Sequence, residues 1–191
     1  MKKPAKSSQL RLIAGKFRSR LITFFEEDGL RPTHSRIRET LFNWLTPIIE
    51  NSTCLDVFAG SGALGFEAIS RGAQHVTFCD TSRKVIHTLK ENAEKLKINN
   101  ADFLNIDFIL QNPIKNKKFD VVFLDPPFKK NVLFSTCELL ESRDLLNSGA
   151  LIYFECEKNS VDFSQLPKNW IIKKHQHTQT IEYGLLGTGT K

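Results

Sequence analysis

From residue 52 onward, short apolar runs alternate with segments whose apolar residues recur at helical spacing. Residues 53–58 and 120–124 are mostly apolar over their whole length, which is typical of strands covered on both faces. Residues 82–96 instead carry apolar side chains three and four positions apart, which predicts an amphipathic helix. This alternation indicates an α/β domain built on a doubly wound sheet.

The predicted elements of this domain, residues 52–191, continue almost to the end of the chain. Strands are expected at residues 53–58, 75–79, 103–107, 120–124 and 150–155, and helices at 64–70, 82–96 and 132–140. Residues 170–174 and 180–186 look like an antiparallel pair that closes the sheet.

Residues 1–51 have a different pattern and are expected to form an N-terminal extension. Apolar patches at 10–14 and 21–25, separated by Gly15 and basic residues, predict a β-hairpin. Residues 35–45 predict a helix, because their apolar residues fall on one face and Pro47 follows the last of them.

The positive charge of the chain is concentrated in this extension. Residues 1–38 hold ten Lys/Arg and three Asp/Glu, a net of +7, whereas the other 153 residues hold 17 and 18, a net of −1. Such a block of basic residues points to a polyanionic partner, of which RNA and DNA are the commonest. A solubilising basic tail is the alternative that charge alone leaves open.

Other features of the composition exclude several classes of protein. No apolar run approaches the roughly 20 residues that cross a bilayer, and no secretory signal follows the basic N-terminus. The four cysteines form no C-x-x-C pair and the five histidines are scattered. We therefore expect reduced cysteines, no metal and no membrane partner, in a cytoplasmic protein.

A glycine-rich turn follows the first strand of the domain. Asp56 lies in the strand, and Gly60 and Gly62 precede the next helix. Glycines let the backbone turn sharply and approach a ligand closely, and the helix N-terminus adds N–H donors. The nearby carboxylate suits a cationic ligand such as S-adenosylmethionine better than a pyrophosphate. A plain strand-to-helix turn is the alternative.

Acids also end the next two strands. Asp80 lies 20 residues after Gly60, the spacing at which an acid hydrogen-bonds ribose hydroxyls in dinucleotide folds. It could equally cap the following helix. Asp107 could accept a hydrogen bond from an adenine amino group, and Phe108 could pack on the purine. A surface turn is the alternative for that pair.

The most specific motif is Asp125-Pro126-Pro127-Phe128, directly after an apolar strand. The prolines fix φ and remove two N–H donors, so nearby carbonyls are left to accept hydrogen bonds. Asp125 adds a side-chain acceptor, and Phe128 adds a flat apolar surface. An exocyclic amine and a flipped base would satisfy both features.

These four motifs, in this order, resemble the class I S-adenosylmethionine-dependent methyltransferases. The Asp-Pro-Pro-Phe motif is similar to the Asn/Asp-Pro-Pro-Tyr/Phe signature of enzymes that methylate amino groups of bases. That signature leaves adenine N6 and guanine N2, and DNA and RNA, undistinguished. A non-catalytic RNA-binding assembly factor also remains open as an alternative.

The N-terminal half resembles one family more closely, the RsmD-type guanine-N2 methyltransferases of bacterial 16S ribosomal RNA. The resemblance is carried by residues 11–20, by Arg31-Pro32-Thr33 and by residues 36–45, and it extends over about residues 10 to 186. Ser19 stands where a glycine is usual in that family. The resemblance implies a Rossmann-like sheet of seven mostly parallel strands, with a last antiparallel hairpin and an N-terminal β-hairpin extension.

The resemblance also implies roles for particular residues. Residues expected to line the S-adenosylmethionine site are Asp56, Gly60, Gly62, Asp80, Asp107 and Phe108. Residues expected to hold the target guanine are Asp125, Pro126 and Phe128. Those expected to face RNA phosphates are Arg11, Lys16, Arg18, Arg20, Arg36 and Arg38. The implied partner is 16S ribosomal RNA in a partly assembled small subunit, bound by a monomer.

Overall fold

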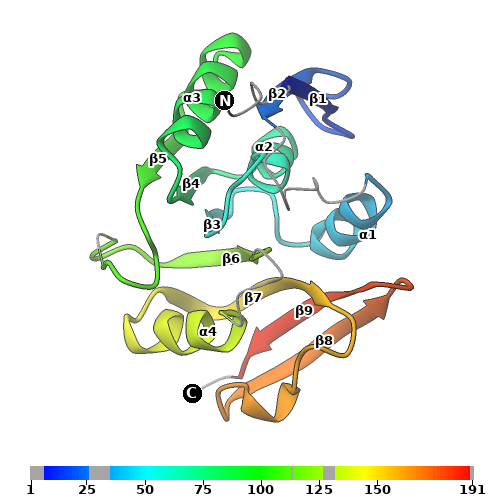
Figure 1. Ribbon diagram of the computed structural model, residues 1–191, viewed down its shortest axis with the longest axis vertical. Helices are drawn as coiled ribbons and strands as arrows, with labels where there is room; N and C mark the ends of the chain where they lie inside the picture. The colour runs from blue at the N-terminus through cyan, green and yellow to red at the C-terminus, as the bar shows by residue number, and fades with distance from the viewer. Residues whose placement is uncertain (1–6, 26–34, 113, 127–131, 190–191) are drawn as a thin grey trace, which may run out of the picture.

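A seven-stranded sheet organises the molecule (Figure 1). The computed structural model describes residues 7–25, 35–112, 114–126 and 132–189. Within these residues the strands of the large sheet are β3 Thr53–Asp56, β4 His75–Asp80, β5 Ala101–Asn105, β6 Phe119–Leu124, β7 Leu146–Glu157, β8 Trp170–His177 and β9 Ile181–Thr188. Their spatial order is β5-β4-β3-β6-β7-β9-β8.

The first five strands of this sheet are parallel, and the last two complete it as an antiparallel pair. β3 pairs in parallel with β4 and β6, while β9 runs antiparallel to both β7 and β8. Central positions such as Val121 and Val122 are fully buried, as expected for near-continuous apolar strands. The carboxyl ends of the parallel strands therefore meet at one edge of the sheet.

Helices cover both faces of the sheet (Figure 1). The helices are α1 Ser35–Leu45, α2 Ala63–Ser70, α3 Arg83–Leu96 and α4 Leu133–Ser142, with a short 3₁₀ turn at Phe163–Gln165. Apolar side chains of α1, α2 and α3 share one hydrophobic core with one face of the sheet. Those of α4 belong to a second core on the other face. The predicted doubly wound architecture is confirmed.

The predicted N-terminal hairpin is also confirmed, and it packs against α3. It consists of β1 Ser7–Arg11 and β2 Leu21–Phe25, paired antiparallel. Ile22 is fully buried in the core that α1, α2 and α3 share. The side chain of Asn92 in α3 makes two hydrogen bonds to the backbone of Thr23. The Thr23 N–H donates to Asn92 Oδ1 at 3.0 Å, and Asn92 Nδ2 donates to the Thr23 carbonyl at 2.7 Å.

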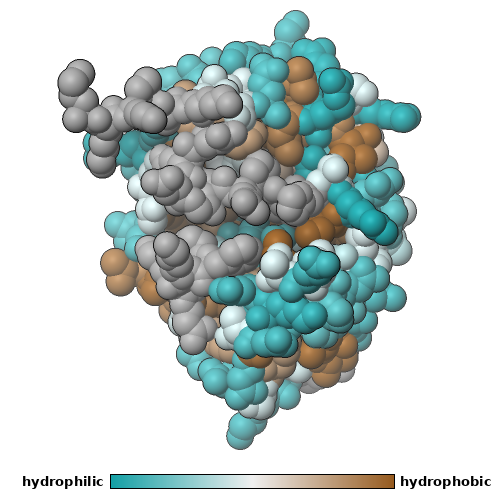
Figure 2. Space-filling model, turned by 45° about the vertical axis from the view of Figure 1, so that its right-hand side comes forward, coloured by the Kyte–Doolittle hydropathy of each residue, from teal (hydrophilic) through white to brown (hydrophobic). Residues whose placement is uncertain are grey.

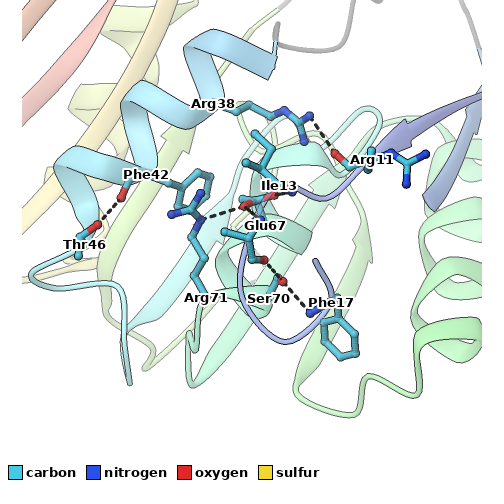
Figure 3. Close-up of polar contacts among 10 residues, drawn as sticks. Arg11, Ile13, Phe17, Arg38, Phe42, Thr46, Glu67, Ser70 and Arg71 are labelled. Carbon is cyan, nitrogen blue, oxygen red and sulfur yellow. Dashed lines mark hydrogen bonds and ion pairs between the residues drawn. The ribbon is translucent and has the colours of Figure 1, made fainter. Parts of the chain in front are cut away.

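The connection between β1 and β2 is bound to α2 through a buried acid, as Figure 3 shows. The fully buried Glu67 carboxylate accepts hydrogen bonds from the N–H groups of Ile13 at 2.8 Å and Ala14 at 3.0 Å. Gly15 lies so close that a Cβ there would be 1.8 Å from the Ser70 carbonyl oxygen. The hairpin and the α/β domain therefore share one packed interior.

Several element boundaries differ from the sequence-based expectation, and the contacts around β5 and β7 explain two of the differences. β5 ends at Asn105, because the Asp107 side chain begins a turn by accepting the N–H of Ile109 at 2.9 Å. β7 begins at Leu146, which pairs with Phe119 before an irregularity in the register. Residues 147–149 are Asn, Ser and Gly, so the apolar pattern does not predict that the strand starts before residue 150. Among the described residues, no helix is long and apolar enough to cross a membrane.

Ser19 offers a test of the hairpin geometry, because it adopts the left-handed conformation with φ of 67°. The contacts made by its backbone, from its N–H to Leu12 and from Arg11 to its carbonyl, do not need the side chain. Ser19→Gly should raise the free energy of unfolding by about 0.5–1 kcal/mol, measured by urea denaturation. Ser7→Gly, in the extended strand β1, should lower it. Equal effects of the two changes would contradict the prediction.

Candidate active site

A tight glycine turn joins β3 to α2. Gly60 and Gly62 have positive φ angles of 49° and 75°, and Gly62 is the N-cap residue of α2. A Cβ on Gly62 would lie 2.5 Å from Leu89 and 2.8 Å from Phe66, so only glycine fits there. The backbone and the α2 N-terminus can therefore come close to a bound ligand.

Asp56 fixes this turn through a hydrogen bond to the helix that follows it. Its side chain is 2% exposed, and its Oδ2 accepts the N–H of Gly65 at 3.1 Å. Burial raises the pKa of Asp56 to about 7; the Gly65 hydrogen bond opposes this rise, and the charge of Asp80 adds to it. The carboxyl group thus contacts the first turn of α2.

Asp80 connects the glycine turn to the following helix. Its Oδ2 accepts the N–H of Gly60 at 3.0 Å, and its Oδ1 accepts the N–H of Ser82, the N-cap of α3, at 2.8 Å. A carboxylate has about four lone-pair sites, so it can still accept ribose hydroxyls. The helix itself is capped by Ser82, whose Oγ accepts the Val85 N–H, so Asp80 holds the turn that leads into the helix, and its ribose contact stays a prediction.

The residues after β5 correct one expectation. Asp107 lies in a turn, where its Oδ1 accepts the N–H groups of Ile109 and Leu110. Phe108 is 3% exposed, and the Arg143 guanidinium lies 5.0 Å from its ring centroid. A ring packed in the core in this way has no open face for a purine. Stacking of Phe108 on adenine was therefore the wrong expectation, whereas the role of Asp107 stays a prediction.

The Asp-Pro-Pro-Phe motif begins where β6 ends, next to the glycine turn. β6 is the parallel neighbour of β3, and the N–H of Val57 donates to the Phe123 carbonyl at 3.2 Å. Asp125 is half-buried and Pro126 is buried. Phe128 lies outside the described residues. Asp125 and Pro126 are thus at the same sheet edge as Asp56 and Asp80.

Five of the six basic residues expected to contact RNA are exposed, and Arg38 is not. The exposed residues are Arg11, Lys16, Arg18, Arg20 and Arg36. Arg38 is 2% exposed, and its Nη2 donates to the Arg11 carbonyl at 3.1 Å (Figure 3). Its Nε and Nη1 have no hydrogen-bond partner in the described part of the chain. A buried guanidinium cannot reach a phosphate, so Arg38 belongs to the hairpin–helix junction instead.

The sequence contains a signal that would have placed Arg38 correctly. Positions 38, 41, 42 and 45 follow one helical face, and the last three are fully buried. Three buried acids were missed altogether, Glu67 in α2, Glu155 in β7 and Glu182 in β9. Each stands in an apolar segment, which is the pattern that indicates a partnered interior carboxyl group.

The pKa of Asp56 leads to a test by pH. Because its folded-state pKa is about 7 and a free Asp titrates near 3.9, the native state keeps a proton that the unfolded chain loses. This contribution to stability is present below about pH 4 and is lost as the pH rises to about 7. Asp56→Asn should therefore lessen the decline in unfolding free energy over that range, measured by urea denaturation. The exposed Asp162→Asn control should retain the wild-type decline, and parallel profiles for Asp56→Asn would refute the assignment.

Comparisons with known proteins identify close relatives over nearly the whole chain. Ribosomal RNA small subunit methyltransferase D of Haemophilus influenzae is 44% identical over 187 residues, 95% of this chain and 95% of its own length. The protein of the same name from Escherichia coli K12 is 41% identical, over 97% of this chain and 94% of its length.

Solved structures agree with these relationships. The structure of yhhF from Escherichia coli superposes with a TM-score of 0.85 at 39% identity, covering 96% of this chain and all of that one. A 16S rRNA N2 G1207 methyltransferase from Thermus thermophilus, in complex with AdoMet and guanosine, shares the fold alone, with a TM-score of 0.74 at 17% identity over 96% of this chain and 50% of that one. Residues 10–186 match the family described as Conserved hypothetical protein 95. The chain therefore belongs to that family, together with the proteins named ribosomal RNA small subunit methyltransferase D.

Proposed function

We propose that this protein transfers a methyl group from S-adenosylmethionine to the exocyclic N2 amine of a guanine in 16S ribosomal RNA. The observation that carries the proposal is the adjacency of the glycine turn after β3 and the Asp125-Pro126 pair after β6. This arrangement stands on the fold of a family whose members include small-subunit ribosomal RNA methyltransferases.

The residues around the glycine turn fit an adenosyl cofactor. Gly60 and Gly62 keep the backbone of the turn free of side chains at positive φ angles, and a Cβ on Gly62 would also collide with Leu89 and Phe66. Asp80 would accept the ribose hydroxyls, and Asp107 would accept the adenine amino group through lone pairs that its turn leaves unused. S-adenosylmethionine, when bound, supplies the activated methyl group.

Asp125 and Pro126 would prepare the guanine amine for attack. The amine lone pair is delocalised into the ring, which makes the amine a poor nucleophile. Acceptance of its two N–H groups by the Asp125 carboxylate and the Pro126 carbonyl favours a geometry in which the lone pair is free. Phe128 would pack on the base. Positioning supplies most of the acceleration, and the proton passes to Asp125 or to water.

The exposed basic residues of the extension would hold the RNA. Figure 2 brings forward the side on which the hairpin and α1 lie, where hydrophilic residues are interspersed with hydrophobic patches. Arg18, Arg20 and Arg36 all expose their side chains. We assign residues 1–51 to RNA docking and residues 52–191 to catalysis. A monomer acting in the cytoplasm on partly assembled small subunits completes the proposal.

Methylation of unmodified 16S ribosomal RNA and small subunits tests the chemistry. The wild type should transfer labelled methyl groups to one guanine, identified as N2-methylguanosine by mass spectrometry. Asp125→Ala should lower kcat by about 10²-fold or more, because one preorganised polar group leaves the reacting centre. Calorimetry should show nearly unchanged S-adenosylmethionine affinity. Methylation of adenine, or full turnover by Asp125→Ala, would count against this assignment.

A salt series tests the RNA-docking surface. Phosphate contacts release counterions, so neutral replacements of Arg18, Arg20 and Arg36 should flatten the dependence of RNA affinity on salt. The slope should change by about 0.7–0.9 per lost contact. A control in which three exposed lysines are neutralised (Lys115, Lys168, Lys173) removes the same charge elsewhere and should change the slope less. Equal slopes for the two triple variants would show that the extension has no special role.

A further inference from the structure

A second carboxyl group lies beside Asp125 and has no role in the chemistry described so far. β6 and β7 are parallel neighbours in which Leu124 pairs with Phe154. The next position on each strand places Glu155 beside Asp125, across the ~4.8 Å that separates neighbouring strands. The Glu155 side chain is 4% exposed. A buried acid therefore adjoins the residues proposed to hold the target amine.

Tyr153 fixes the position of this acid. Its hydroxyl donates to Glu155 Oε2 at 2.7 Å, and its side chain is fully buried. Burial raises the pKa of Tyr153 well above its ordinary value, and the charges of Glu155 and then Asp125 raise it further. Because the charge of Asp125 acts on the Tyr153 hydroxyl, the two carboxyl groups and the phenol share one region of the site.

Glu155 has more acceptor capacity than the protein uses. A carboxylate offers about four lone-pair sites on its two oxygens. Within the described residues, the hydrogen-bond donor to Glu155 is the Tyr153 hydroxyl, on Oε2. Keeping a buried carboxyl group with so few donors is unfavourable for folding. The group is therefore suited to a donor that the substrate brings.

We propose that Glu155 selects guanine by accepting a hydrogen bond from its ring N1–H. The inference rests on the proposed function, because it takes the base held by Asp125 and Pro126 to be a guanine. In guanine, the amino group on C2 adjoins N1–H, which is a donor. In adenine, the amino group on C6 adjoins N1, which is an acceptor. A carboxylate beside the amine-binding residues thus stabilises guanine and disfavours adenine.

The recognition requires Glu155 to be ionised when the base is bound. Burial raises the pKa of Glu155, and the hydrogen bond from Tyr153 lowers it. A second donor, the guanine N1–H, favours the charged form further. An unprotonated N1 would instead bring a lone pair toward the carboxylate, and a site built for a hydrogen bond rejects such an analogue strongly.

The test uses 16S ribosomal RNA in which the methylated guanine is replaced by 2-aminopurine. This base keeps the C2 amine but has an unprotonated N1. The wild type should prefer guanine by about tenfold or more in kcat/KM. Glu155→Gln should reduce that preference by about tenfold or more, because an amide can donate to the unprotonated N1. The missing O6 affects both proteins alike, so the change in preference isolates N1.

Controls separate recognition from folding. Glu157→Gln changes an exposed carboxylate on the same strand and should keep the wild-type preference. S-adenosylmethionine affinity should be the same in all variants. If Glu155→Gln slows both substrates equally, Glu155 is structural and the inference is overturned. If the wild type accepts 2-aminopurine as well as guanine, the inference is overturned whether or not the variant folds. A wild type that methylates no guanine would overturn the proposed function itself.

Discussion

The hydrogen bonds to the buried Glu67 carboxylate fix the N-terminal hairpin against the α/β domain, and the rest of the arrangement depends on them. A charge with no exposure must be paired, and Glu67 accepts two hairpin N–H groups and the Arg71 Nε at 2.8 Å. α2, which carries this carboxylate, follows directly after its N-cap residue Gly62 in the glycine turn. One helix of eight residues therefore joins the proposed RNA-docking hairpin to the proposed cofactor site.

The proposed chemistry depends on a second constraint, the alignment of parallel strand ends. Asp56, Asp80 and Asp125 come from β3, β4 and the residue after β6, which are neighbours in the sheet although they span 70 positions of the chain. Their surroundings differentiate them. Asp56 is buried with a raised pKa, whereas Asp80 and Asp125 are half-buried at the edge. The same residue type is thus buried beneath the turn in one place and partly exposed at the sheet edge in the others.

The sequence predicts most of the fold because its signals are local. The helix at 35–45 and the hairpin follow from periodicity and turns, and the glycine turn follows from three closely spaced residues. Burial between distant segments is not local, so it was missed. Arg38 belongs by composition to the basic block, but its helical face places it inside. Phe108 follows an acid in the pattern of a purine site, yet its ring fills the core against Arg143. The roles of Glu67 and Glu155 depend on hydrogen-bond partners that come together only in the folded chain.

The junction also explains why an arginine can be kept inside the protein next to the hairpin. Burial lowers the pKa of Arg38, while the negative charge of Glu67 raises it and the positive charge of Arg71 lowers it. Two cations thus share one buried anion, and part of the Arg38 guanidinium has no hydrogen-bond partner among the described residues. Replacement of Arg38 would release α1 from the Arg11 carbonyl. Replacement of Glu67 would leave Arg71 and two amide N–H groups without their acceptor and would remove the negative charge that acts on Arg38. Among Glu67, Arg38 and Arg71, Glu67 is therefore the residue whose loss would disrupt the junction between the hairpin and α2 most.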